Sequence, residues 1–197
     1  AELREVLVWD MLTERFEITN WLQRELVRDS DVFGDWQAGT PDQPALLFQS
    51  VHSLKKLVNG QPLVRPWWWF DPTISGESMA DVGTHLADLA IWFVSPDQSV
   101  DYKTQIQMIA ADRTPLLLSE DDYRQVTRQS GYPPELKSRV VNGQLYYAGN
   151  NTATFTLRGV HVRLSTEWEF ESPGGDMHQS YARGRQATVS VRQEAKG

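Results

Sequence analysis

The chain has 197 residues, a formal net charge of −7 and no cysteine. Its 40% hydrophobic and 23% charged residues are typical of a globular protein with an ample core. The missing cysteines exclude disulfides, thiolate metal sites and cysteine nucleophiles. The acidic balance argues against a nucleic-acid partner, and no apolar run approaches the roughly 18 residues of a membrane span.

The first 45 residues predict a strand, a helix and a loop. Residues 6–9 are a short apolar run, typical of a strand. Residues 13–28 predict a helix, because Phe16, Ile18, Trp21, Leu22 and Leu26 recur near a period of 3.6. Glycines and prolines then mark residues 29–44 as a loop.

The middle of the chain contains the strongest predicted helix, at residues 76–93. Before it, residues 45–48 favour a strand, and residues 50–58 predict a short helix that ends at Asn59-Gly60. Three consecutive tryptophans at residues 67–69 lie in an extended or irregular segment between two prolines.

The C-terminal half predicts mostly strands. Residues 102–110 alternate as in a half-buried strand, and residues 120–128 predict a short helix. A hairpin with a type I′ turn is expected around Asn142-Gly143, and further strands at residues 152–157, 160–170 and 188–191. Because helical spacers are lacking here, the pattern favours an antiparallel sheet over a parallel one.

One face of the predicted helix at residues 76–93 carries several ionisable side chains. Asp81, His85 and Asp88 are four and three residues apart, which directs them to one side of a helix. Carboxylates one turn away on each side would orient the imidazole and favour its protonated form, as a general acid/base requires. The same pattern also fits a solvated helix face, or half of a metal site for which no second cluster is obvious.

Two other site types are disfavoured. The sequence contains neither a Gly-x-Gly-x-x-Gly dinucleotide loop nor a Gly-Lys-Ser/Thr phosphate loop. Gly76-Glu-Ser78-Met-Ala80 approaches the nucleophile elbow of hydrolases, but Asp71-Pro72-Thr73 is a poor strand to precede it.

The segment Gly76-Glu-Ser-Met-Ala-Asp81-Val-Gly83-Thr-His85-Leu-Ala-Asp88-Leu-Ala-Ile-Trp92 resembles a signature helix of the glucose–fructose oxidoreductase / inositol dehydrogenase / MocA (Gfo/Idh/MocA) family. These are NAD(P)-dependent oxidoreductases of sugars and cyclitols. A narrower subgroup with a distinctive C-terminal domain is matched by Asp10-Met-Leu-Thr13-Glu-Arg15, Ser50-Val-His52, Lys56-Leu-Val-Asn-Gly60, Arg65-Pro-Trp67, Gly159-Val-His161, Asp176-Met-His178 and Arg183-Gly184.

The resemblance implies an α+β fold with a large, predominantly antiparallel sheet and helices packed on one face. It implies that residues 1–45 are the end of an N-terminal Rossmann domain that is otherwise missing, and that residues 46–197 form a C-terminal substrate-binding and oligomerisation domain. By position, His85 corresponds to the catalytic acid/base and Asp81 to its supporting carboxylate. The family's Glu-Lys-Pro motif is absent. NAD or NADP would therefore bind the full-length parent, and this fragment alone would be inactive.

Weaker substrate-binding candidates surround these two residues. Tryptophan faces stack on sugars but also pack cores, and the remaining side chains fit structural roles equally well. These candidates are Asp88, Arg65, Trp67, Trp69, Lys56, His52, Asp176 and His178.

The leading hypothesis is a substrate-binding domain of an NAD(P)-dependent sugar, polyol or cyclitol oxidoreductase. Its expected partners are a small polyhydroxylated substrate, the missing Rossmann domain and a second copy bound through the sheet. The alternative is a non-catalytic carbohydrate-binding or oligomerisation domain that uses the cluster from Trp67 to Trp69. A cytoplasmic location is expected, with the periplasm as the alternative.

Overall fold

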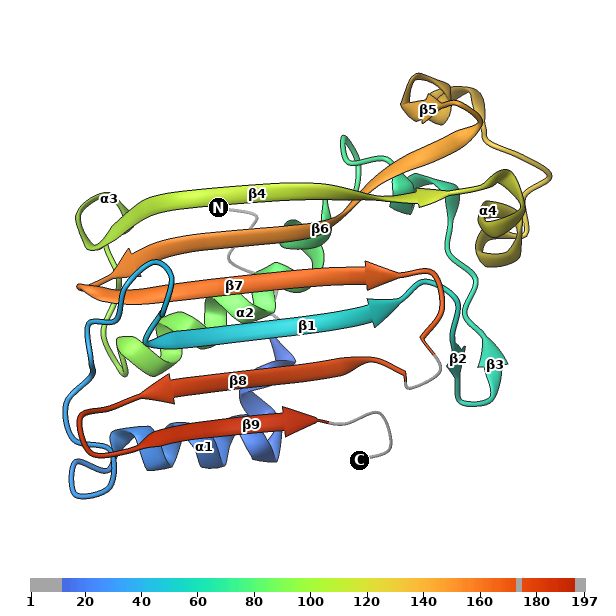
Figure 1. Cartoon of the computed structure of the whole chain (residues 1–197). Coiled ribbons are helices and arrows are strands. Elements are labelled where there is room, and N and C mark those ends of the chain that lie inside the picture. Colours follow the sequence, from blue (N-terminus) through green and yellow to red (C-terminus); the bar gives the residue numbers. More distant parts are fainter. Residues whose placement is uncertain (1–11, 173–174, 194–197) are drawn as a thin grey trace, which may run out of the picture.

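The computed structural model describes residues 12–172 and 175–193, so the strand expected at residues 6–9 lies outside the described residues. A seven-stranded sheet dominates the fold, with strand order β4-β6-β7-β1-β8-β9 and β5 paired with β6 (Figure 1). A separate two-stranded sheet joins β2 and β3. The strands are β1 Leu46–Ser53, β2 Leu57–Val58, β3 Gln61–Pro62, β4 Ile106–Leu118, β5 Val140–Val141, β6 Gln144–Leu157, β7 Val160–Glu169, β8 Met177–Arg183 and β9 Thr188–Gln193.

The large sheet is mixed but mainly antiparallel. Strand β1 runs parallel to β7, and the other neighbouring pairs are antiparallel. This confirms the predicted α+β class with its predominantly antiparallel sheet. The hairpin between β5 and β6 turns through Asn142 and Gly143 at φ of 51° and 79°, as a type I′ turn requires.

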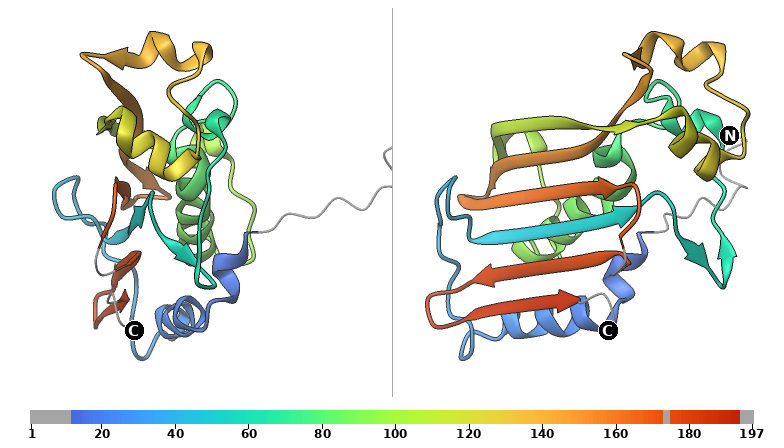
Figure 2. Two further views of the ribbon diagram at one scale, coloured as in Figure 1. Left: turned by 90° about the vertical axis from the view of Figure 1, so that its right-hand side faces the viewer. Right: turned by 45° about the vertical axis from the view of Figure 1, so that its right-hand side comes forward.

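Two helices, α1 Ile18–Arg28 and α2 Ser78–Val94, lie on the same face of the sheet (Figures 1 and 2). Helix α2 packs Leu86, Leu89 and Phe93 into a core that includes Phe48 and Leu164 of the strands. The smaller helices are η2 Thr13–Phe16, η3 Trp67–Phe70, α3 Tyr102–Gln105, α4 Glu120–Thr127 and η4 Pro134–Arg139.

Helix α1 is amphipathic, but it buries its polar face and exposes its apolar face. Its buried residues are Asn20, Gln23, Arg24 and Val27. The apolar residues that predicted the helix point outward, and Phe16, Ile18 and Leu22 are 86%, 59% and 53% exposed. Phe16 at the end of η2, with Ile18, Trp21, Leu22 and Leu26 of α1, forms what we call the α1 stripe, and no described residue covers it.

A second core lies at the end of the sheet where β4 and β6 extend toward α4 (Figure 1). Rings dominate it. The Trp69 ring lies 4.7 Å from Tyr147 and 5.0 Å from Trp168, and Phe70 lies 5.4 Å from Tyr123. The three tryptophans lie in a short 3₁₀ helix, where an extended or irregular segment was expected.

Around the centre of the sheet, one prediction is wrong and one strand was missed. Residues 50–58 are not a helix, because β1 continues to Ser53 and Asn59-Gly60 is the turn between β2 and β3. Strand β8 was not predicted at all. Both segments mix polar and apolar residues, because each strand contributes polar side chains to a cavity beneath the helices.

Residues from the segment 1–45, which the sequence assigns to a preceding domain, belong to the core between the sheet and α2. Val27 and Phe33 are buried there. The boundary at residue 45 stays a prediction.

Candidate functional site

A cavity of about 410 Å³ lies between α2, the segment that contains η2 and α1, and the adjacent ends of β1 and β8. It contains most of the titratable residues singled out from the sequence. Its lining consists of Glu14, Glu17, Thr19, Asn20, Ser50, His52, Asp81, Val82, His85, Leu86, Asp176, Met177, His178 and Gln193.

The strand register explains why residues far apart in the sequence meet here. Ser50 of β1 is paired with His178 of β8 in the antiparallel ladder. Because alternate residues of a strand share a face, His52 lies on the same side as Ser50 and also faces the helices. The loop before β8 adds Asp176 beside His52.

Four residues that line the cavity each have a buried polar atom without a hydrogen-bond partner among the described residues. These atoms are Asn20 Oδ1, His52 Nε2, His85 Nδ1 and His178 Nε2. Asn20 is only 1% exposed. Buried polar atoms are nearly always hydrogen-bonded in native proteins, so their convergence indicates a place where a polar ligand would be held.

Asp176 is held by three donors. Its Oδ2 lies 3.0 Å from His52 Nδ1 and also accepts a hydrogen bond from Lys56 Nζ, and its Oδ1 accepts the Ser53 amide at 3.0 Å. Burial by itself raises the pKa of the Asp176 carboxyl, but these hydrogen bonds outweigh it and hold the pKa well below its usual range. Asp176 is therefore an ionised carboxylate near neutral pH.

His178 is a partly buried, neutral imidazole. Its Nδ1 lies 3.2 Å from Ser50 Oγ, and its ring packs 6.2 Å from that of Phe48. Burial, followed by repulsion from His52, lowers the pKa of His178 to about 4. Its place on strand β8, paired with β1, accounts for this environment.

Asp81 and His85 both line the cavity from α2, but the two flanking carboxylates do not orient His85 as expected. No hydrogen bond joins His85 to Asp81 or Asp88 among the described residues. Asp88 lies outside the lining, and its carboxylate is taken by Arg15, whose Nε donates to Oδ2 at 2.6 Å.

Arg65 and the tryptophans lie apart from this cavity lining. The Arg65 guanidinium is 4.2 Å from the Trp69 ring and 4.8 Å from the Trp168 ring, and its donors reach the carbonyls of Ser53 and Leu54. Trp67 packs against the same aromatic core. Arg65 therefore fixes the end of β1, next to His52.

Ser78 is no exposed nucleophile. It is fully buried, its Oγ lies 2.6 Å from Thr166 Oγ1, and it accepts a hydrogen bond from Asn151 at 2.6 Å. These contacts anchor the start of α2 to β6 and β7.

The described residues do not fit a dinucleotide. A Rossmann site needs a strand that passes through a glycine turn directly into a helix. Here β4 enters α4 through Ser119, whose side chain caps the helix, and Gly76 precedes α2 only after a 3₁₀ helix. In the part of the chain that is described, no group of three His, Asp or Glu residues could hold a metal ion.

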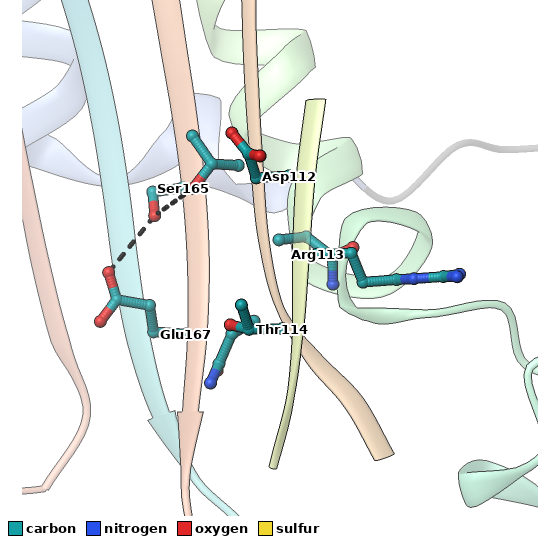
Figure 3. Close-up of a pocket in the computed structure, with 8 residues that line it drawn as sticks. Asp112, Arg113, Thr114, Ser165 and Glu167 are labelled. Carbon is teal, nitrogen blue, oxygen red and sulfur yellow. Dashed lines mark hydrogen bonds between the residues drawn. The ribbon is translucent and has the colours of Figure 1, made fainter. Parts of the chain in front are cut away.

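A second, polar hollow of about 250 Å³ lies between β4, β6 and β7 (Figure 3). Ser165 donates to Glu167 at 3.3 Å, and the Arg113 side chain points away from both. Ser165 alternates with Thr166, which faces α2, so Ser165 and Glu167 belong to the opposite, uncovered face of the sheet.

The family comparison decides the classification. The family model described as "Putative oxidoreductase C terminal domain" matches residues 22–197. The chain belongs to this family. No curated protein matches the sequence.

Solved structures extend the comparison. The oxidoreductase C-terminal domain is 39% identical to a "putative oxidoreductase from Parabacteroides merdae ATCC 43184", with a TM-score of 0.93 over 100% of this chain and 45% of that chain. The domain thus spans less than half of that protein.

Two more distant structures are similar in fold alone. "GenD2 from gentamicin A biosynthesis in complex with NAD" is 12% identical, with a TM-score of 0.58 over 98% of this chain and 41% of that one. A "putative myo-inositol dehydrogenase from Sinorhizobium meliloti 1021" is also 12% identical, with a TM-score of 0.52 over 91% and 40%. The fold is that of a Gfo/Idh/MocA C-terminal domain. Among the described helices, none has the length and apolarity needed to span a membrane.

The sequence did not reveal Asn20, Ser50, Glu14 and Glu17 as cavity residues. Asn20 lies opposite the apolar stripe of its helix, where a polar residue normally faces solvent. Only the reversed orientation of α1 makes it part of the cavity.

Proposed function

We propose that the domain binds a sugar, polyol or cyclitol in the cavity beside His85 and supplies the substrate site of an NAD(P)-dependent oxidoreductase. The observation that carries this proposal is that four residues lining one cavity each have an unpartnered buried polar atom. A molecule with several hydroxyl groups can donate to and accept from such atoms at once. Of the distant structures with the same fold, the putative myo-inositol dehydrogenase agrees with this substrate class, and the NAD complex of GenD2 agrees with the cofactor.

In this proposal His85 and Asp81 hold the reacting hydroxyl and exchange its proton. Both project from α2, a rigid element whose start is anchored by Ser78. No carboxylate is hydrogen-bonded to His85 among the described residues, and its buried Nδ1 has no partner there that a ligand group would have to replace. The nicotinamide cofactor belongs to a part of the protein that these residues do not form.

The charge of the cavity disfavours anionic substrates. Its lining includes four carboxylates, Glu14, Glu17, Asp81 and Asp176, and neither lysine nor arginine among the residues that line it. Lys56 offsets Asp176. Carboxylates repel anions at close range, so neutral or amino-substituted polyols should bind better than phosphorylated or carboxylated ones.

The α1 stripe supports the proposal of a missing nucleotide-binding partner domain. A contiguous apolar helix face is rarely left in water unless another surface covers it. The Parabacteroides merdae protein, which is 39% identical, is more than twice as long as this chain. The additional part of such a protein is a candidate for the surface that covers the stripe.

The test is turnover by the full protein that contains this domain, with NAD and NADP and a panel of cyclitols and sugars. His85→Ala should lower kcat at least a hundredfold, the usual contribution of a positioned acid/base, while thermal unfolding stays that of a folded protein. His161→Ala is the matched control, because His161 contacts the Ala38 carbonyl and lies outside the cavity. Equal turnover in the two variants would refute the role of His85.

A further inference from the structure

We propose that Asp176 and His52 form a fixed carboxylate–imidazole pair that presents His52 Nε2 to a ligand hydroxyl as a hydrogen-bond acceptor. The proposal deepens the function proposed above, on which the identity of the ligand rests. It makes His52 a second ligand-binding imidazole beside His85, and Asp176 the positioning residue that acts through it.

The direction of the hydrogen bond follows from the chemistry of its partners. Asp176 is ionised, so its oxygens can only accept. His52 Nδ1, 3.0 Å away, must therefore carry the proton. In a neutral imidazole the other nitrogen is then an acceptor. Here that nitrogen is Nε2, which is buried and has no hydrogen-bond partner among the described residues, in a residue that lines the cavity.

The pair is supported from several sides. Lys56 Nζ and the Ser53 amide bind the carboxylate and fix its position. The His52 ring packs 5.1 Å from the Trp168 ring at an angle of 32°, which restricts its rotation. The imidazole is consequently held at both its nitrogen and its face.

The tautomers of the other two cavity histidines are not fixed by a carboxylate. His178 faces Ser50, whose hydroxyl can donate or accept, so its tautomer is not fixed by that contact. His85 has no partner at Nδ1. Among the three cavity histidines, His52 is therefore the one whose tautomer is fixed by its contacts before a ligand binds.

Nitrogen NMR of the full protein tests the pair without any ligand. With ¹⁵N-labelled histidine at pH 8, His52 should show a protonated Nδ1 and an unprotonated Nε2, assigned by loss of its signals in His52→Gln. Asp176→Asn should disturb these signals, whereas Glu171→Gln, which alters an exposed ion pair with Lys55, should leave them unchanged. A wild-type His52 that carries its proton on Nε2 overturns the proposal, whatever the variants do.

A titration with myo-inositol and glucose, in the presence of NAD, tests the ligand contact. A polyol that occupies the cavity should shift the Nε2 resonance of His52 and bind roughly fivefold to tenfold more weakly to His52→Gln and Asp176→Asn. His161→Gln should keep wild-type affinity.

The outcomes separate the two proposals. Binding that shifts His85 but not His52 overturns the ligand role of His52 and leaves the proposed function intact. If neither polyol binds, the proposed function and the ligand contact fail together, while the tautomer result still decides whether the pair exists.

Discussion

The chemistry of the cavity depends on what each histidine faces. His52 is tied to a carboxylate, His178 faces a hydroxyl, and His85 Nδ1 has no partner in the described chain. Identical side chains thereby offer a ligand different donor and acceptor arrangements. The sequence motif identified His85 and its helix, but it could not show that Asp88 is engaged by Arg15.

His178 should make the stability of the protein pH-dependent. Its pKa is about 4 in the folded protein, below the ordinary value of 6.5, so the unfolded chain takes up the proton first as the pH falls. The free energy of unfolding should therefore decrease from about pH 7 to pH 4, by about 3 kcal/mol in total from this group. Urea unfolding at several pH values measures it.

The control for this prediction is the variant His178→Gln, which retains a polar side chain but cannot titrate. Its unfolding free energy should vary less between pH 7 and pH 4, whereas His161→Gln should follow the wild type. A wild-type curve that stays flat over this range would contradict the burial of a neutral His178. Loss of the Asp176 interactions has the same sign but belongs below pH 4, since its pKa is lowered from 3.8.

Individual elements show which sequence signals were reliable. Helix α2 was predicted nearly to its ends, because its apolar spacing matches its burial against the sheet. The existence of α1 was also predicted, but not its orientation. Periodicity reveals that a helix has two faces, and only the tertiary structure shows that the polar face of α1 is the buried one.

The full length of β1 and the existence of β8 could not be predicted from the local sequence pattern. Their inward-facing residues include Ser50, His52 and His178, which interrupt the apolar alternation of an ordinary half-buried strand. The departure from the pattern coincides with the candidate site, as is expected where function overrides local preference.

The start of α2 should depend on Ser78. In Ser78→Ala, Thr166 Oγ1 and Asn151 Nδ2 lose a buried partner, which should lower the free energy of unfolding by about 1–3 kcal/mol. Urea denaturation provides the measurement. Thr84→Ala is the matched comparison, because its exposed hydroxyl bonds only the Asp81 carbonyl within its own helix, and its change should be smaller. Equal losses in both variants would show that the anchor is unimportant.

At the scale of the whole molecule, the sheet has one face covered by helices and one uncovered (Figure 2). The uncovered face has a ready hydrogen-bond network, in which Gln49 donates to Glu167 at 2.7 Å and accepts from Gln179. Such a polar but ordered surface fits the proposed pairing with a second copy of the chain.

Light scattering of the full protein tests this pairing. The wild type should form a dimer, and Glu167→Arg should lower the dimer fraction, because a twofold axis brings the substituted face of one copy against the same face of the other. Glu171→Arg, beyond the end of β7, is the control that should remain dimeric. A wild type that stays monomeric at high concentration would refute the pairing.

The α1 stripe has a consequence for the fate of the protein in the cell. If a neighbouring domain covers the stripe, as proposed, then truncation or misfolding of that domain returns four large apolar side chains of α1, and Phe16 of η2, to water. Such surfaces are what chaperones and proteases detect in damaged proteins. With that domain in place, α1 would couple the lifetime of this domain to the integrity of its neighbour.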